Sequence, residues 1–73
     1  MKFINVESSN IEAIGYEYED ESLYIKYLNG SVYKFYKVPK QIYEEFLSAP
    51  SKGQFMNSRI KGAFSYVKMT TLP

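Results

Sequence analysis

The residues that could carry out chemistry in this sequence are carboxylates, serines, lysines and tyrosines, because the chain contains neither histidine nor cysteine. Histidine and cysteine are the side chains that most often titrate or attack near neutral pH, so their absence removes most hydrolase schemes. The consecutive acids at residues 19–21 offer a weak site for a divalent ion. Nothing nearby in the sequence would desolvate them, and the run is more typical of a solvated hairpin tip.

Ser8, Ser9 and Asn10 have no neighbouring base and are more typical of a turn or a helix cap than of a nucleophile site. Gly53 and Gly62 belong to no glycine-rich loop that joins a strand to a helix, so nucleotide-binding motifs are missing. Zinc sites that use cysteine are impossible. We therefore predict that the protein is not an enzyme and has no catalytic residue, no metal and no cofactor.

The elements that would position any binding surface must form a small core rich in aromatic rings. The 73 residues suffice for one domain, and they include eight tyrosines and five phenylalanines. No segment approaches the roughly 20 apolar residues of a membrane span, and residues 1–5 lack the apolar stretch of a secretory signal. We predict a single domain over residues 1–73, located in the cytoplasm and without membrane contact.

A two-residue alternation of apolar and polar side chains predicts three antiparallel strands, in residues 14–18, 23–27 and 33–35. Residues 3–6 are a candidate edge strand, and residues 64–67 are expected to form either a short closing strand or an extended tail along the domain. The end of the chain, Thr70 to Pro73, is expected to fray.

The turn at Asn29 and Gly30 can be assigned from the side-chain faces. A two-residue loop would place Lys34 opposite Ile25, on the face that should form the core. A three-residue loop with a G1 bulge at Gly30 keeps the apolar residues on one face. We therefore predict the pairs Tyr27 with Ser31, Ile25 with Tyr33 and Leu23 with Phe35. For the preceding turn we predict the pairs Tyr18 with Leu23 and Tyr16 with Ile25.

Two short helices are expected after the strands. Pro39 suits the first helical position, apolar residues then recur at helical spacing, and Pro50 must end the first helix. Ser51 with Gln54 reads as a capping box that opens a second helix, which would end near Gly62. The predicted fold class is α+β, with a three- to four-stranded antiparallel β-meander followed by two short helices packed on one sheet face.

The order of residues over nearly the whole chain resembles a known small family. Its motifs read Val6-x-Ser8-Ser9-x-Ile11, Ile14-Gly15-Tyr16, Leu23-x-Ile25-x-Tyr27-x-x-Gly30-x-x-Tyr33-x-Phe35-x-x-Val38-Pro39, Ala49-x-Ser51-x-Gly53, Phe55-Met56-Asn57 and Ile60-Lys61. These motifs resemble the KTSC domain, which is named for the carboxy-terminal domain of some lysyl-tRNA synthetases and also occurs as a free-standing bacterial or phage protein. The central Tyr-x-Tyr motif of that family falls on Tyr33-Lys34-Phe35, where phenylalanine replaces the second tyrosine. The resemblance implies an RNA-binding role through the association with synthetases.

The charges are distributed unevenly along the chain. Residues 1–21 contain one lysine and six acids, whereas residues 22–73 contain eight bases and two acids. Such asymmetry can mark a basic surface for nucleic acid, but pairing of distant strands can also let the acidic segment neutralise the basic one.

The predicted register places tyrosines and lysines on the sheet face opposite the core, where rings could stack on bases and amines could neutralise phosphates. The residues predicted to bind nucleic acid are Tyr24, Lys26, Lys34, Tyr36, Lys37, Arg59 and Lys61. Tyr33 and Phe35 are predicted to pack in the core. The alternative for the exposed residues is that tyrosine and lysine simply suit solvent-facing strands.

Two functions remain open from the sequence. The first is a small RNA-binding module, and the second is a protein–protein interaction adaptor that uses an edge strand or the second helix. In either case we expect a monomer.

Overall fold

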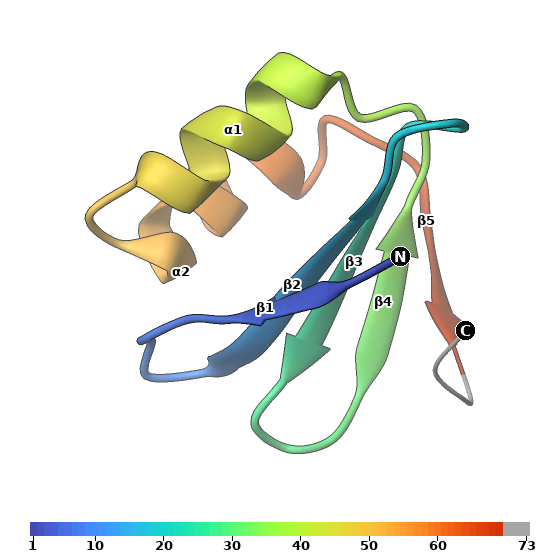
Figure 1. Ribbon diagram of the computed structural model, residues 1–73. Coiled ribbons are helices and arrows are strands. Elements are labelled where there is room, and N and C mark those ends of the chain that lie inside the picture. The colour runs from blue at the N-terminus through green and yellow to red at the C-terminus, as the bar shows by residue number, and fades with distance from the viewer. Residues whose placement is uncertain (70–73) are drawn as a thin grey trace.

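The computed structural model describes residues 1–69 and consists of a five-stranded antiparallel sheet with helices on one face (Figure 1). The strands are β1 (Phe3–Asn5), β2 (Ile11–Glu17), β3 (Ser22–Tyr27), β4 (Val32–Phe35) and β5 (Tyr66–Met69). The helices are α1 (Lys40–Ser48), α2 (Lys52–Phe55) and a π-helical turn, η1 (Met56–Ile60). The sheet order β1-β2-β3-β4-β5 is a simple meander. The predicted α+β class is confirmed, but the predicted count of three to four strands is too low, because β1 and β5 both form at the edges of the sheet. The predicted frayed end, residues 70–73, lies outside the described residues.

The predicted hairpin between β3 and β4 is confirmed residue by residue. Leu23 pairs with Phe35, and Ile25 pairs with Tyr33. Gly30 has φ of 91°, and its N–H donates to the Tyr27 carbonyl at 2.9 Å. A left-handed residue at this position closes the three-residue loop without a Cβ penalty.

The predicted register between β2 and β3 is wrong by two residues. Tyr16, not Tyr18, pairs with Leu23, and Ile14 pairs with Ile25. The connecting loop is longer than predicted, because Asp20 accepts a hydrogen bond from the Ser22 N–H at 3.2 Å and Glu21 adopts φ of 57°. A shift of two residues preserves the side-chain face, so the same residues still face the helices.

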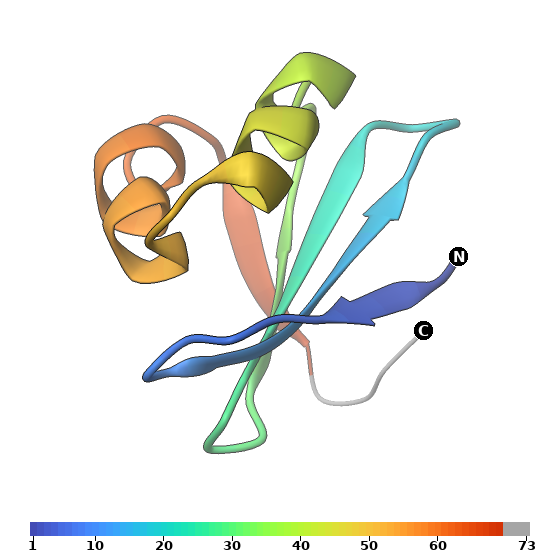
Figure 2. The same ribbon diagram turned by 60° about the vertical axis from the view of Figure 1, so that its left-hand side comes forward.

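The core lies between the sheet and the helix layer, which covers one side of the sheet (Figure 2). Phe46 of α1 is fully buried. The Tyr16 ring stacks on Tyr43 of α1 with centroids 4.4 Å apart, and the Tyr16 hydroxyl donates to the Val38 carbonyl. These contacts fix the connection between β4 and α1 against the sheet. As predicted, the apolar residues that alternate with polar ones along β2, β3 and β4 point toward the helices.

The two predicted helices begin where the sequence places them, but the second one changes type. Ser51 accepts a hydrogen bond from the Gln54 N–H at 3.2 Å, as a helix-opening cap does. After α2 the chain widens into η1, and the Lys61 N–H donates to the carbonyl of Met56, five residues earlier, at 2.8 Å. Single π-helical turns are rare in proteins, and those that occur often lie at functional sites. No helix within residues 1–69 is long and apolar enough to cross a membrane.

Candidate functional site

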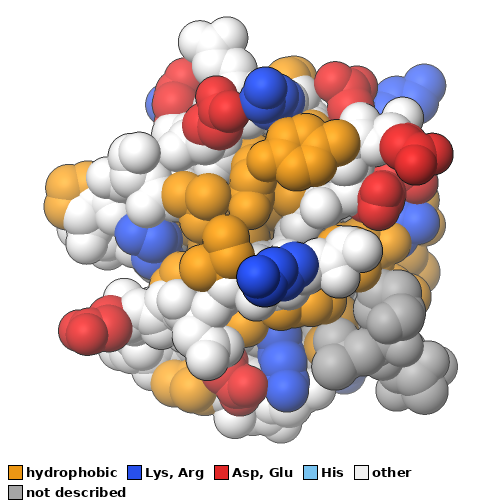
Figure 3. Space-filling model, viewed as in Figure 1, with side chains coloured by type: hydrophobic (Ala, Val, Ile, Leu, Met, Phe, Trp, Pro, Cys, Tyr) orange, Lys and Arg blue, Asp and Glu red, His pale blue; other side chains and the backbone are white. Residues whose placement is uncertain are grey.

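The fold mixes the acidic and basic segments of the chain. Glu12 of β2 pairs with Lys26 of β3 at 3.2 Å, so the acidic strand partly neutralises the basic one. On the side of the molecule seen in Figure 3, acidic and basic side chains surround a central band of hydrophobic atoms. That side therefore offers no uniformly basic surface to nucleic acid. Within residues 1–69, no group of three or more acidic side chains is placed to hold a metal ion.

Tyr24, predicted to be an exposed stacking residue, is buried in the structure. Its side chain is only 6% exposed, because β1 joins the sheet and brings the Phe3 ring to 6.2 Å from the Tyr24 ring. Gly15, which pairs with both Phe3 and Tyr24, leaves room for this contact, since a Cβ at Gly15 would lie 3.1 Å from the Phe3 ring. The expectation that Tyr24 faces solvent is wrong, and the cause is the added edge strand.

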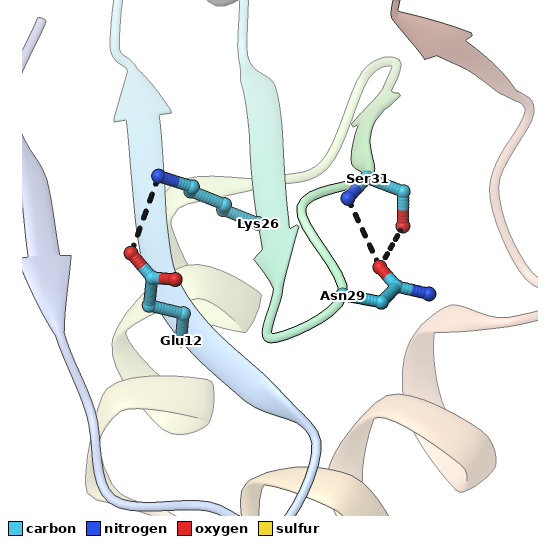
Figure 4. Close-up of polar contacts among 4 residues, drawn as sticks. All are labelled: Glu12, Lys26, Asn29 and Ser31. Atoms are coloured by element: carbon cyan, nitrogen blue, oxygen red, sulfur yellow. Dashed lines mark hydrogen bonds and ion pairs between the residues drawn. The ribbon is translucent and has the colours of Figure 1, made fainter.

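Lys26 and Lys34 lie on the same outer face as Tyr24 but have local partners. Figure 4 shows Lys26 reaching across to Glu12. The Lys34 amine lies 5.6 Å from the Tyr24 ring centroid and 5.1 Å from that of Tyr36, within the range of cation–π attraction. Both lysines are half-buried. These two lysines therefore have partners within the protein, so this face is not an open binding surface.

The other predicted site residues are spread over the molecule. Tyr36 is exposed at the end of β4, and Lys37 follows it with φ of 55° in the connection to α1. Arg59 lies in η1, where it pairs with Glu45 at 2.9 Å. Lys61 lies just after η1. The structure thus brings Lys34, Tyr36 and Tyr24 together, and it places Arg59 and Lys61 in the helix layer.

A cleft of about 470 Å³ opens on the helix side of the sheet, between the β3–β4 hairpin, β5 and the turn after η1. Four aromatic rings, two hairpin polar residues and the turn form its walls. The lining residues are Tyr27, Asn29, Ser31, Tyr33, Phe35, Lys61, Gly62 and Tyr66. Only Lys61 among them carries a charge.

The aromatic rings of the cleft are arranged edge-to-face and tilted instead of packed flat against one another. Tyr27 and Tyr33 meet at 5.6 Å with an interplanar angle of 89°. Tyr66 of β5 lies 5.7 Å from Tyr33 and 5.3 Å from Phe35. Tyr66 is 59% exposed, so much of its surface faces solvent. An exposed ring beside other rings is a suitable platform for a planar ligand.

The polar wall of the cleft is a rigid turn at the tip of the β3–β4 hairpin. The Asn29 side-chain oxygen accepts from the Ser31 N–H at 3.0 Å and from the Ser31 hydroxyl at 2.7 Å (Figure 4). An asparagine that bonds the backbone two residues on is an Asx turn, which fixes the side chain. Because the backbone N–H can only donate, the atom facing it must be Oδ1. Within residues 1–69 the Asn29 NH₂ group makes no hydrogen bond, so it can donate to a ligand.

Burial affects one hydroxyl of the cleft. Desolvation raises the pKa of Tyr27 above its ordinary value, and the neighbouring Tyr33 hydroxyl raises it further. The Tyr27 hydroxyl therefore stays protonated at neutral pH and can donate a hydrogen bond.

The sequence predicts Lys61 as a nucleic-acid contact but indicates no cleft, and it misses most of the wall in which the structure places Lys61. Phe35 is buried in the core as predicted, yet one side of it still lines the cleft, and Tyr33 is only half-buried. Tyr66 could not be assigned, because its position depends on the pairing of Phe35 with Tyr66, and no turn links β4 directly to β5. The motif at residues 33–35 is the sequence signal that could have indicated this wall of the cleft.

The architecture defines a small α+β domain in which a β-meander carries a helix layer and an open aromatic cleft. The model of the KTSC domain family matches residues 7–64. The chain belongs to the KTSC domain family.

The relatives include both free-standing proteins and a segment of much larger ones. The chain is 38% identical over 64 residues to a protein of Tsukamurella paurometabola, of which it covers 96%. It is 41% identical over 64 residues to a lysine–tRNA ligase of Nostoc punctiforme, but it spans only 11% of the length of that ligase. The crystal structure of a KTSC domain protein from Yersinia pestis superposes with a TM-score of 0.88 at 36% identity, over 93% of this chain and 96% of that one.

Proposed function

We propose that this domain is an RNA-binding accessory module that acts as a monomer, with the aromatic cleft as its main contact surface. The observation that carries the proposal is the composition of the cleft wall, which combines one exposed and two half-buried tyrosine rings with one lysine and no carboxylate. Single-stranded nucleic acids are bound by this combination, because bases stack on aromatic rings and lysine neutralises phosphates.

The surroundings of the cleft support the same role. Lys68 pairs with Tyr33 across the β4–β5 ladder and therefore lies on the same face of the sheet, where it is exposed. Together with Lys61 it gives the cleft a basic margin. Lys34, Tyr36 and Lys37 of the predicted set are proposed as secondary contacts, whereas Tyr24 and Lys26 are assigned to the stability of the outer face.

The relatives of this chain supply a second line of support. A related segment occurs within lysine–tRNA ligases, which are enzymes named for an RNA substrate. A small domain attached to such an enzyme would assist it by binding RNA. In a free-standing chain the same surface would serve as an independent RNA-binding module.

The test is a titration of fluorescently labelled RNA at several salt concentrations, with single-stranded and hairpin oligomers. Binding is expected to be stronger for single strands and to weaken with salt, with a logarithmic slope of about −0.7 for each phosphate contacted. The complete absence of binding at low salt and millimolar RNA would contradict the proposal.

A protein-interaction adaptor is the second candidate, and the outer edge of β5 favours it. β5 is the last strand of the sheet, and Tyr66 and Val67 on it are 59% and 43% exposed. An exposed edge strand can pair with a strand of another chain. Affinity capture with and without nuclease separates the two functions, because captured proteins that persist after nuclease treatment favour the adaptor, and proteins that are lost favour RNA.

A further inference from the structure

We infer that the aromatic cleft accepts one unpaired base of an RNA strand and selects against adenine through Asn29. This inference rests on the proposed function and specifies the ligand of the same site.

The size and shape of the cleft suit one base with its ribose. Its volume of about 470 Å³ lies in the lower part of the range of ligand sites, about 300–1,000 Å³. Tyr66 offers an exposed ring on one side, and Tyr33 lies 5.7 Å away at an interplanar angle of 53°. Asn29 and Ser31 line the same cleft as Tyr66, so their polar groups are available to the edge of a base that stacks on the Tyr66 ring.

The hydrogen bonds of Asn29 determine which base edge is favoured. A side-chain amide pairs with adenine by accepting from N6 and donating to N7, which requires its oxygen. In this structure Ser31 occupies both acceptor positions of Asn29 Oδ1, through its N–H at 3.0 Å and its hydroxyl at 2.7 Å. Asn29 can therefore only donate. It can bond N7 of adenine but leaves the adenine N6 amine without an acceptor, whereas guanine presents two acceptors, N7 and O6, on the same edge.

The π-helical turn positions the charge of the site. The Lys61 N–H is held by the Met56 carbonyl at 2.8 Å, and the next turn is closed by the Ala63 N–H on the Ile60 carbonyl at 3.1 Å. Gly62 between them has φ of 81°, a conformation that glycine adopts readily. The turn thus holds Lys61 at the wall of the cleft, where its amine can reach the phosphate of the bound nucleotide.

The experiment measures binding of the four ribonucleoside 5′-monophosphates and of short oligoribonucleotides by nuclear magnetic resonance. Guanosine and adenosine monophosphates are the matched pair, since their purine rings stack with similar area. The guanosine nucleotide is expected to bind about five- to ten-fold more tightly, and Ser31→Ala, which frees one acceptor position of Asn29, should narrow that ratio. Equal affinity for the two purines, or a ratio unchanged in the variant, would overturn the selection against adenine.

Two matched pairs of variants locate the site. Tyr66→Ala should weaken oligoribonucleotide binding about ten-fold through lost stacking, whereas Tyr18→Ala, which removes a similarly exposed ring from the β2–β3 connection, should leave it nearly unchanged. Lys61→Ala should weaken binding more than Lys2→Ala, which removes the same charge next to the opposite edge strand.

The outcomes separate the inference from the proposed function. RNA binding that is insensitive to Tyr66→Ala and Lys61→Ala overturns the cleft as base site and leaves an RNA-binding function in place. Mononucleotide binding in the cleft without oligoribonucleotide binding overturns the function and keeps the base site. Absence of both overturns both.

Discussion

The two faces of the sheet use the same residue types, tyrosine and lysine, in opposite ways. On the outer face, Tyr24 is covered by Phe3, Lys26 is paired with Glu12, and Lys34 lies between two rings. On the helix side, Tyr66 and Lys61 lie at the open wall of a cleft.

This difference shows that the neighbouring elements decide what a tyrosine on a strand can do. Tyr24 has β1 beside it and becomes part of the structure. Tyr33 and Tyr66 lie where the helix layer ends, so their rings are only partly covered. Aromatic and basic composition alone therefore does not identify a binding face.

The largest expected effect comes from Tyr24→Ala. This change removes a ring that is 94% buried, given its 6% exposure, and should lower the free energy of unfolding by about 3 kcal/mol. Tyr36→Ala, on the same face but 40% exposed, should cost less than about 1 kcal/mol. Chemical denaturation measures both; similar losses for the two variants would contradict the division of the outer face into buried and exposed tyrosines.

A smaller effect is expected from Gly15→Ala. The new Cβ would lie 3.1 Å from the Phe3 ring, and displacement of β1 should cost about 1–2 kcal/mol. In the background of Phe3→Ala the same change should cost much less, because the obstructing ring is gone. A double-mutant cycle by denaturation tests this, and additive losses would show that Phe3 does not pack against Gly15.

The pH dependence of stability should report the buried hydroxyls. Desolvation raises the pKa of Tyr16, Tyr27 and Tyr43 above the ordinary value of 10.0. The unfolded chain therefore loses these protons first as pH rises, so stability is complete below pH 10.0 and falls as pH climbs from there toward the folded pKa values. Thermal unfolding across this range tests the sign, and Tyr27→Phe should make the decline shallower. Stability that rises above pH 10.0 would refute the assignment.

The smallest effect concerns the ion pair of Lys26 and Glu12. Both side chains are partly exposed, so Lys26→Ala should change the free energy of unfolding by less than about 1 kcal/mol. The RNA affinity of Lys26→Ala should fall only as far as that of Lys2→Ala, because each variant loses one positive charge outside the cleft. A much greater fall in RNA affinity for Lys26→Ala would indicate that the outer face of the sheet is the principal RNA interface.

The sequence predicts the fold well because side-chain alternation and turn chemistry are local signals. The G1 bulge at Gly30 followed from keeping Lys34 off the core face, and the capping serine at residue 51 followed from its spacing to Gln54. The loop before Ser22 is longer than the sequence predicts, because its length depends on a hydrogen bond to the Asp20 side chain and on the left-handed conformation of Glu21.

The candidate site is less predictable, since it depends on contacts between distant segments. To predict the burial of Tyr24, one would need to know that the Phe3 ring packs over Gly15. To predict the cleft, one would need the pairing of β4 with β5. The turn from α2 into η1, which places Lys61, has no signal in side-chain periodicity.

The most direct test of the central claim is the mapping of chemical shift changes as a guanosine- or uridine-containing single-stranded RNA is added to labelled protein. The account predicts that the largest changes fall on Tyr33, Lys61 and Tyr66, with much smaller ones at Lys34 and Tyr36. Changes confined to Lys34, Tyr36 and their neighbours on the outer face, with the cleft unmoved, would contradict it.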